Sequence, residues 1–158
     1  MNTTDTNTTD TPSDLKLGSW SELQKFALPL RLAVFVQEQG VPVALEQDEF
    51  DAHATHAVMI GPDGVTLATG RLVTRSAGVA KIGRLAVARP WRRRGFGKLV
   101  LQALIDHASQ SGVRTIKLHA QLEAQSFYSL FGFVPEGEPF MEAGIEHVLM
   151  VRHLITAT

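Results

Sequence analysis

Cysteine is absent from this chain of 158 residues, and its absence excludes several kinds of chemistry. Without thiols the protein can form no disulfide bond, no thiolate zinc site and no acyl-enzyme on a cysteine sulfur. Net charge is also nearly lacking, because 15 Lys and Arg stand against 16 Asp and Glu. Such a chain has no overall electrostatic attraction to nucleic acid or to an anionic membrane, so any charge effect must be local.

Long hydrophobic runs are lacking as well, since none approaches the roughly 20 residues that a bilayer span requires. With 44% hydrophobic and 20% charged residues, the composition is typical of a soluble globular protein. Residues 1–13 are mostly Thr, Asn and Asp, with neither a basic start nor an apolar stretch. We expect them to be a disordered tail without a signal peptide, on a cytoplasmic protein whose residues 14–158 form one domain.

From residue 14 onward the chain alternates between strand-like and helix-like periodicity, which predicts an α/β fold. The periodicity predicts, in chain order, a strand over 15–17, a helix over about 20–39, strands over 56–60, 65–74 and 79–87, a helix over 97–111, a strand over 115–118, a short helix over 122–130 and a strand over 148–155. Ser19 or Ser21 can cap the first helix, and Pro29 is expected to kink or split it.

The strand over 79–87 breaks its own alternation. Ile82 lies on one parity, whereas Leu85 and Val87 lie on the other. Either both faces of this strand are covered, or a β-bulge near Gly83 resets the pattern.

The most informative segment is a strand, a basic glycine loop and a helix start that follow one another over residues 85–98. Gly95 and Gly97 have no side chain to block approach, so several N–H groups at the helix N-terminus can point together at one anion, such as a phosphate. Five positive residues accompany them: Arg89, Arg92, Arg93, Arg94 and Lys98. Their charge opposes the helix dipole, so helix stability does not explain them.

Several alternatives compete for this loop. A solvated basic turn is the simplest, and a nucleic-acid patch would need more stacking aromatics than Trp91 and Phe96. A Walker-type phosphate loop requires Ser or Thr after the lysine, but Lys98 is followed by Leu99. A dinucleotide fingerprint requires a third glycine where Val100 stands.

The pattern Arg-x-x-Gly-x-Gly over residues 92–97, placed after a bulged strand, resembles motif A of the GNAT superfamily of acetyl-CoA-dependent N-acyltransferases. A second signature of that family is an aromatic-Tyr pair followed by Gly-Phe, and residues 127–133 fit it. The resemblance covers about residues 15–154 and implies a mixed, mostly antiparallel sheet of six or seven strands flanked by about four helices.

A closer subgroup is indicated by three stretches, residues 34–42, 45–51 and 141–147, which resemble the small bacterial ElaA-like and YjcF-like acetyltransferases. One departure is that Glu146 stands where relatives often carry Pro before the histidine. The resemblance also leaves a homodimer open, because similar proteins are often dimers.

The resemblance implies acetyl-CoA as cosubstrate and no metal. In the family, loop amides hold the pyrophosphate, which assigns this role to the loop residues Arg92, Arg93, Arg94, Gly95, Phe96, Gly97 and Lys98. A splayed strand offers backbone groups to the pantetheine arm, and here that strand is Leu85, Ala86 and Val87.

Acetyl transfer to an amine requires that the thioester be oriented, that the ammonium lose a proton and that the leaving thiolate be stabilised. The resemblance assigns the last role to Tyr128, the only tyrosine, as hydrogen-bond donor or general acid; a merely packed aromatic is the alternative. It assigns the base to His147, since an imidazole can accept a proton at neutral pH. Glu38, Glu46 or Asp48 could act instead. With no cysteine and no Ser-His pair, we expect direct attack in a ternary complex.

We expect the acceptor to be a small-molecule amine or an amino-acid-like molecule, and the sequence leaves both open. Residues 32–70 contain no Lys or Arg but six acidic residues: Glu38, Glu46, Asp48, Glu49, Asp51 and Asp63. This stretch could attract a cationic amine, or it could be a solvated loop. Conversely, Arg31, Arg71, Arg75 and Arg84 could bind a carboxylate or phosphate on the acceptor. A CoA-binding module or pseudoenzyme without transferase activity is the alternative function.

Overall fold

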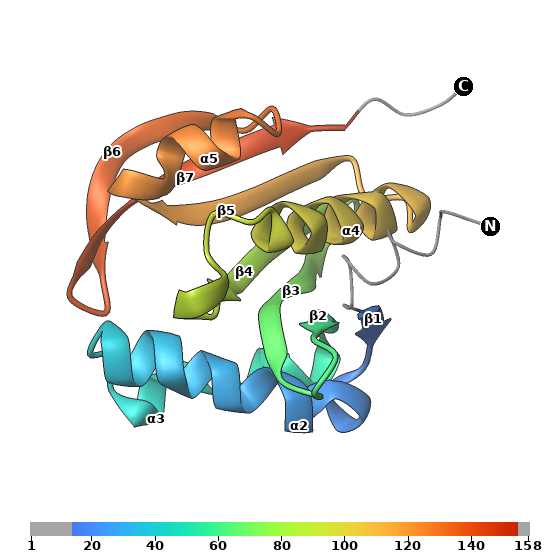
Figure 1. Ribbon diagram of the computed structural model, residues 1–158. Helices are drawn as coiled ribbons and strands as arrows, with labels where there is room; N and C mark the ends of the chain where they lie inside the picture. Colours follow the sequence, from blue (N-terminus) through green and yellow to red (C-terminus); the bar gives the residue numbers. More distant parts are fainter. Residues whose placement is uncertain (1–13, 155–158) are drawn as a thin grey trace.

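The computed structural model describes residues 14–154, which form a seven-stranded mixed sheet with helices on both faces (Figure 1). The tail predicted for residues 1–13 lies outside the described residues. The strands are β1 (Asp14–Gly18), β2 (Thr55–Ile60), β3 (Thr66–Ser76), β4 (Val79–Val87), β5 (Thr115–Gln121), β6 (Val134–Glu142) and β7 (Ile145–His153). Their order is β1-β2-β3-β4-β5-β7-β6, and every pair is antiparallel except β4 with β5. The predicted sheet is therefore confirmed.

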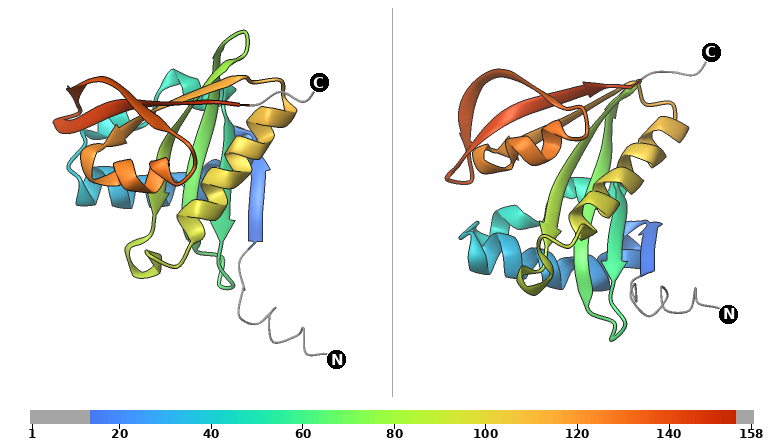
Figure 2. Two further views of the ribbon diagram at one scale, coloured as in Figure 1. Left: turned by 90° about the horizontal axis from the view of Figure 1, so that it is seen from above. Right: turned by 45° about the horizontal axis from the view of Figure 1, so that its top comes forward.

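Within the described residues four α-helices flank the sheet: α2 (Trp20–Arg31), α3 (Val43–Glu46), α4 (Phe96–Gln110) and α5 (Gln125–Ser129). Helix α2 packs on one face of the central strands and α4 on the other (Figures 1 and 2). The predicted apolar stripe of α4 is buried, from Gly97 and Val100 to Ala108. Its close approach to β3 depends on Gly70, where an added Cβ would lie 3.0 Å from the Leu104 side chain.

The first helix begins as predicted and ends differently. Ser19 is its N-cap, and its side chain and that of Glu22 form a capping box. The helix predicted over about 20–39, with a kink or split at Pro29, includes Pro29 within α2 and changes type after Arg31, because Leu32–Glu38 is a π-helix. There the N–H of Gln39 donates to the carbonyl of Val34 at 3.0 Å, five residues earlier, so the turn is wider. Such wide turns often occur at functional sites.

The bulge predicted near Gly83 is present. Thr69 pairs with Ala86 and Arg71 with Gly83, so β4 contains one residue more than β3 over this interval. Arg84, within the bulge, has a φ of +53°, in the left-handed region. Strand β4 pairs with β5 only from Val79 to Ile82, and beyond this point the two strands diverge (Figure 2).

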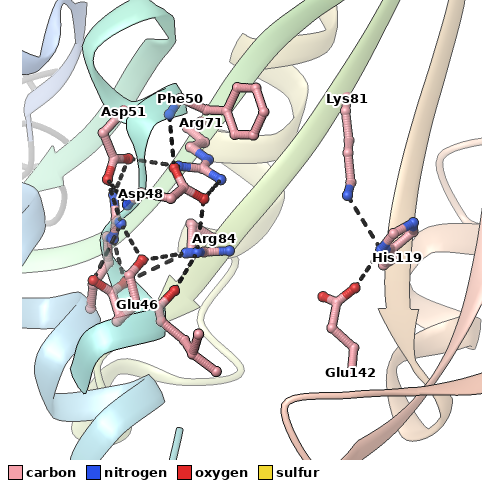
Figure 3. Close-up of polar contacts among 11 residues, drawn as sticks. Glu46, Asp48, Phe50, Asp51, Arg71, Lys81, Arg84, His119 and Glu142 are labelled. Atoms are coloured by element: carbon pink, nitrogen blue, oxygen red, sulfur yellow. Dashed lines mark hydrogen bonds and ion pairs between the residues drawn. The ribbon is translucent and has the colours of Figure 1, made fainter. Parts of the chain in front are cut away.

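A buried ion-pair cluster ties the segment between α2 and β2 to the sheet (Figure 3). Its members are Arg31, Glu46, Asp48, Asp51, Arg71 and Arg84. The guanidinium of Arg31, which is 1% exposed, donates to Glu46 and, at 2.8 and 3.0 Å, to Asp51. Arg71 donates to Asp51 at 2.7 Å and to Asp48 at 2.7 and 2.9 Å. Three cations therefore balance three carboxylates.

Arg84 completes the cluster from the bulge. Its Nε donates to the carbonyl of Glu46 at 2.9 Å, and one Nη donates to Asp48 at 3.2 Å. The strained backbone of Arg84 is therefore held by bonds to the segment that it anchors. None of the helices in residues 14–154 is long and apolar enough to cross a membrane.

The cluster predicts acid sensitivity. Burial would raise the pKa of Asp51, but hydrogen bonds and charges from Arg31 and Arg71 outweigh it and lower this pKa to about 2. A lowered pKa stabilises the folded state above pH 4, and this contribution, about 2 kcal/mol, is lost as the pH falls through 2. We expect the free energy of unfolding, measured with urea, to fall by at least this amount between pH 5 and pH 2.

Asp51→Asn should lower the free energy of unfolding at pH 7 by about 3 to 5 kcal/mol, since it leaves buried arginine charge uncompensated. It should also flatten the acid dependence. Asp63→Asn, in an exposed turn, is the matched control and should change neither quantity. An acid dependence that is equally steep in Asp51→Asn would show that another group causes it.

Candidate functional site

The divergence of β4 and β5 opens a cavity of about 480 Å³ on the α2 face of the sheet. Residues of β3, β4, β5 and β7 form its floor, and the segment between α2 and β2 forms a side wall. Tyr128 and His147, the two predicted catalytic residues, both line this cavity, as does Leu85 of the bulged strand. The structure therefore brings these three predicted residues together although they are far apart in the sequence.

Tyr128 lies on α5, and its ring packs against Phe127 and Phe133 at centroid distances of 5.1 and 6.2 Å. Its hydroxyl has no hydrogen-bond partner among residues 14–154. Burial raises the pKa of Tyr128 to about 12, so the phenol stays protonated at neutral pH. The ring is thus packed while the hydroxyl can donate a hydrogen bond to a ligand.

His147 lies on β7 and is 7% exposed. Its Nδ1 lies 2.7 Å from the carbonyl of Ile145, which can only accept, so Nδ1 carries the ring proton. In the neutral ring Nε2 is then the free acceptor. Stacking on Phe140, at a centroid distance of 6.0 Å, fixes the ring plane. This arrangement suits a general base.

The acidic alternatives to His147 are all paired with arginine. Glu46 belongs to the buried ion-pair cluster, and so does Asp48, whose pKa burial would raise but Arg71 and Arg84 lower. Hydrogen bonds from Arg92 lower the pKa of Glu38. Carboxylates held in this way are poor proton acceptors at neutral pH.

The ion-pair cluster also corrects two expectations about the acceptor. The expectation that the acidic stretch attracts a cationic amine is wrong for Glu46, Asp48 and Asp51, because three arginines neutralise their charges. The expectation that Arg31, Arg71 and Arg84 bind an anionic acceptor is also wrong, because these arginines are paired with the same three carboxylates. Of the four arginines considered, only Arg75 lines the cavity without belonging to the cluster.

The glycine loop lies at the far end of β4 from the β4–β5 pairing. A short 3₁₀ turn, Arg89–Trp91, leads into it, and α4 begins at Phe96. Gly95 has a φ of +87° and Arg93 a φ of +66°, so the chain turns sharply in the left-handed region. The backbone N–H groups of residues 93–98 have no acceptor among residues 14–154. They lie at the start of a helix of 15 residues, where they can bind an anion.

Side chains around the loop divide into two groups. Arg93, Arg94 and Lys98 are exposed, and Arg94 lies over the ring of Trp91 at 4.9 Å. Gly97 is buried, and a Cβ there would lie 3.1 Å from the Val87 side chain, so this glycine allows α4 to approach β4.

Arg92 is held by the protein itself. Its Nε donates to the carbonyl of Val87 at 2.9 Å, and its two Nη atoms donate to the carboxylate of Glu38 at 2.7 Å each. Glu38 ends the π-helix. The bidentate pair therefore joins the π-helix, the end of β4 and the loop. Sequence analysis missed this pair because nothing local links residues 54 positions apart.

A second polar group in the cavity was also missed. Lys81 on β4 has its Nζ 3.3 Å from Nδ1 of His119 on β5, and that Nδ1 lies 2.7 Å from a carboxylate oxygen of Glu142 on β6 (Figure 3). All three residues line the cavity. The alternation of side chains along a strand could have predicted that Lys81 lies on the same face of the sheet as Gly83. No group of three or more metal-ligating side chains occurs within residues 14–154.

The two halves of the site are joined by β4, whose Leu85 lines the cavity and whose Val87 contacts Arg92. Beyond Ile82 the edge of β4 that faces β5 is unpaired. The arrangement fits a ligand with phosphate groups at one end, bound by the loop amides, and an extended arm that pairs with β4. Acetyl-CoA has this construction.

Comparisons with known proteins find similarity to acetyltransferases. A family model described as an acetyltransferase (GNAT) domain matches residues 16–154. The uncharacterized N-acetyltransferase YjcF of Bacillus subtilis is 34% identical over 133 residues, which cover 83% of this chain and 93% of that protein. Among solved structures, an acyl-CoA N-acyltransferase from Pseudomonas aeruginosa is 30% identical with a TM-score of 0.80, covering 89% of this chain and 99% of its own. Escherichia coli ElaA is 27% identical with a TM-score of 0.80 and the same coverage.

The Glu38–Arg92 pair predicts an indirect effect on ligand binding. Glu38→Gln removes the carboxylate that fixes Arg92, so the loop should lose order without losing any ligand contact. We expect the Kd of acetyl-CoA, measured by calorimetry, to rise about fivefold, as for a partly exposed bidentate pair worth about 1 kcal/mol. Glu49→Gln, an exposed residue outside the loop, should leave the Kd unchanged. An unchanged Kd in Glu38→Gln would show that the loop holds its shape alone.

Proposed function

The chain belongs to the GNAT acetyltransferase family, and from this premise we propose that it moves an acetyl group from acetyl-CoA to a primary amine of a small molecule. The transfer proceeds by direct attack in a ternary complex, and residues 14–158 act as one catalytic domain. The observation that supports the proposal most is the continuity of the site. Unpaired amides at the start of α4 connect through the free edge of β4 to a cavity that holds Tyr128 and His147.

Acetyl-CoA supplies the activated acetyl thioester. The backbone N–H groups of residues 93–98 bind its pyrophosphate, because a helix N-terminus favours negative charge. Arg93, Arg94 and Lys98 add positive charge close by. Arg92 contributes by fixing the loop. Backbone groups of Leu85, Ala86 and Val87 pair with the amides of the pantetheine arm, as a neighbouring strand would.

The chemical step assigns one proton to each catalytic residue. Nε2 of His147 takes a proton from the acceptor ammonium, and the freed amine lone pair forms a bond to the thioester carbonyl carbon. The C–S bond then breaks, its electron pair leaves on sulfur, and the new amide nitrogen gives its remaining extra proton to the thiolate, which leaves as free thiol. The pKa of Tyr128, about 12, is above the 8.5 of an ordinary thiol, so its hydroxyl stabilises the thiolate by a hydrogen bond and keeps its own proton.

The direct test is an acceptor screen. Purified protein is mixed with acetyl-CoA and a panel of amines, free thiol is followed by colour, and products are identified by mass spectrometry. Acetylated amine and equimolar thiol support the proposal. Tight CoA binding with no product from any amine would identify a CoA-binding module without transferase activity.

Tyr128→Phe removes one hydroxyl and keeps the ring that packs on Phe127 and Phe133. It should lower kcat about 10- to 100-fold, because one hydrogen bond to the developing thiolate is lost. The Kd of acetyl-CoA should change less than twofold, since the thioester itself needs no donor. Steady-state kinetics and calorimetry measure the two effects. An unchanged kcat would remove Tyr128 from the mechanism.

His147→Gln keeps a hydrogen-bonding side chain that cannot act as a base. In the wild type, kcat/KM should rise with pH along an acidic limb, because general-base catalysis requires a base that is free to accept a proton. The variant should lose that limb and at least about 100-fold in rate at pH 7. His153→Gln, an exposed position on the same strand, is the matched control and should retain the limb. A limb that survives in His147→Gln would assign the base to another group.

A further inference from the structure

The cavity floor carries two cations that acetyl transfer does not use. Lys81 on β4 pairs in register with Val73 on β3, and Arg75 follows two residues later, on the same face. Both Arg75 and Lys81 line the cavity. The same floor continues across the sheet through β5 to β7, which carries His147.

The other charged groups of the cavity already have partners within the protein. The ion-pair cluster sets three arginines against three carboxylates. Glu142 is held by His119. Arg75 lies over the ring of Phe50 at 4.5 Å and makes no ion pair with any carboxylate of the described residues. The cavity therefore keeps an excess of positive charge.

Lys81 is not satisfied by its neighbour. Nδ1 of His119 can either donate or accept one hydrogen bond. It lies 2.7 Å from a carboxylate oxygen of Glu142, which can only accept, so Nδ1 carries the ring proton. The Lys81 ammonium, 3.3 Å from the same nitrogen, then has no lone pair to donate to. Burial lowers the pKa of Lys81, Glu142 opposes this, and the charges of Arg75, Arg71 and Arg84 lower it further. The half-buried ammonium therefore lacks a hydrogen-bond acceptor, and it lacks a counter-charge of its own because the nearest carboxylate, Glu142, is bonded to His119.

An oxyanion would supply both. We propose that the acceptor is an amine that also carries an anionic group, a carboxylate or a phosphonate or phosphate, which Lys81 and Arg75 bind while the amine reaches His147. Apolar side chains that line the same cavity, including Phe35, Val41 and Leu85, cover the carbon chain that joins the two groups. This inference rests on the proposed function, and it names the acceptor class that the function leaves open.

Matched acceptors test it. Three amines share a three-carbon chain and differ at its end: 4-aminobutanoate, 3-aminopropylphosphonate and propylamine. Phenylalanine and 2-phenylethylamine form a second pair. In the wild type, kcat/KM for an amine that carries an anionic group should exceed that of its partner without one by at least about tenfold, which is the contribution of one charge-assisted hydrogen bond. Whichever anion gains more identifies the group as carboxylate or phosphonate.

Variants connect this preference to the two cations. Lys81→Met should raise the KM of the acceptors with an anionic group about tenfold and leave that of the other amines unchanged. Lys81→Arg should retain most of the preference for an anionic group. Lys117→Met is the control, because Lys117 is the register partner of Lys81 on β5 but is exposed and outside the cavity lining. Arg75→Gln, at an exposed position, tests the same site where Lys81→Met fails to fold.

The inference would be overturned if amines without an anionic group had the same kcat/KM as those with one. It would also be overturned if Lys81→Met raised the KM of both kinds of amine equally. If no amine is acetylated, the proposed function fails and binding alone decides. Calorimetry with 4-aminobutanoate and 3-aminopropylphosphonate then compares the wild type with Lys81→Met and Arg75→Gln. Binding that the variants lose still supports an anion site, whereas equal binding or none at millimolar concentration rejects it.

Discussion

Strand β4 holds one residue more than its neighbour β3 across the bulge, and beyond Ile82 it leaves its parallel partner β5. The remaining features of the site depend on this separation. It creates the cavity, leaves one edge of β4 unpaired, and brings the end of the strand to the glycine loop. A regular ladder here would bury the same backbone groups and close the cavity.

The separation must be supported, because an open sheet edge and a left-handed Arg84 both cost free energy. The ion-pair cluster provides part of that support by fixing the segment between α2 and β2 against the sheet. The Glu38–Arg92 pair holds the loop in the same way, and a hydrogen bond of 3.0 Å between Gln39 and Gln121 joins the π-helix to β5 across the opening. The charged groups inside this protein thus serve mainly to hold segments in place, and the excess positive charge at Lys81 and Arg75 is the exception.

Local patterns predicted what local physics decides. The cap at Ser19, the buried stripe of α4 and the bulge near Gly83 all follow from a few neighbouring residues, and the structure confirms them. The resemblance to ElaA and YjcF acetyltransferases is also confirmed. The sequence could not predict the partners of the arginines or the Lys81–His119 contact, since these depend on residues that only the folded sheet brings together. The π-helix left no pattern distinct from that of an α-helix.

The structure of the protein crystallised with coenzyme A would test the central claim most directly. If the loop and the parted strands form the binding site, the pyrophosphate oxygens should lie about 3 Å from the backbone nitrogens of residues 93–98, with the pantetheine arm along β4 and the sulfur beside the Tyr128 hydroxyl. Coenzyme A bound elsewhere on the molecule, or no density for it at saturating concentration, would contradict the account.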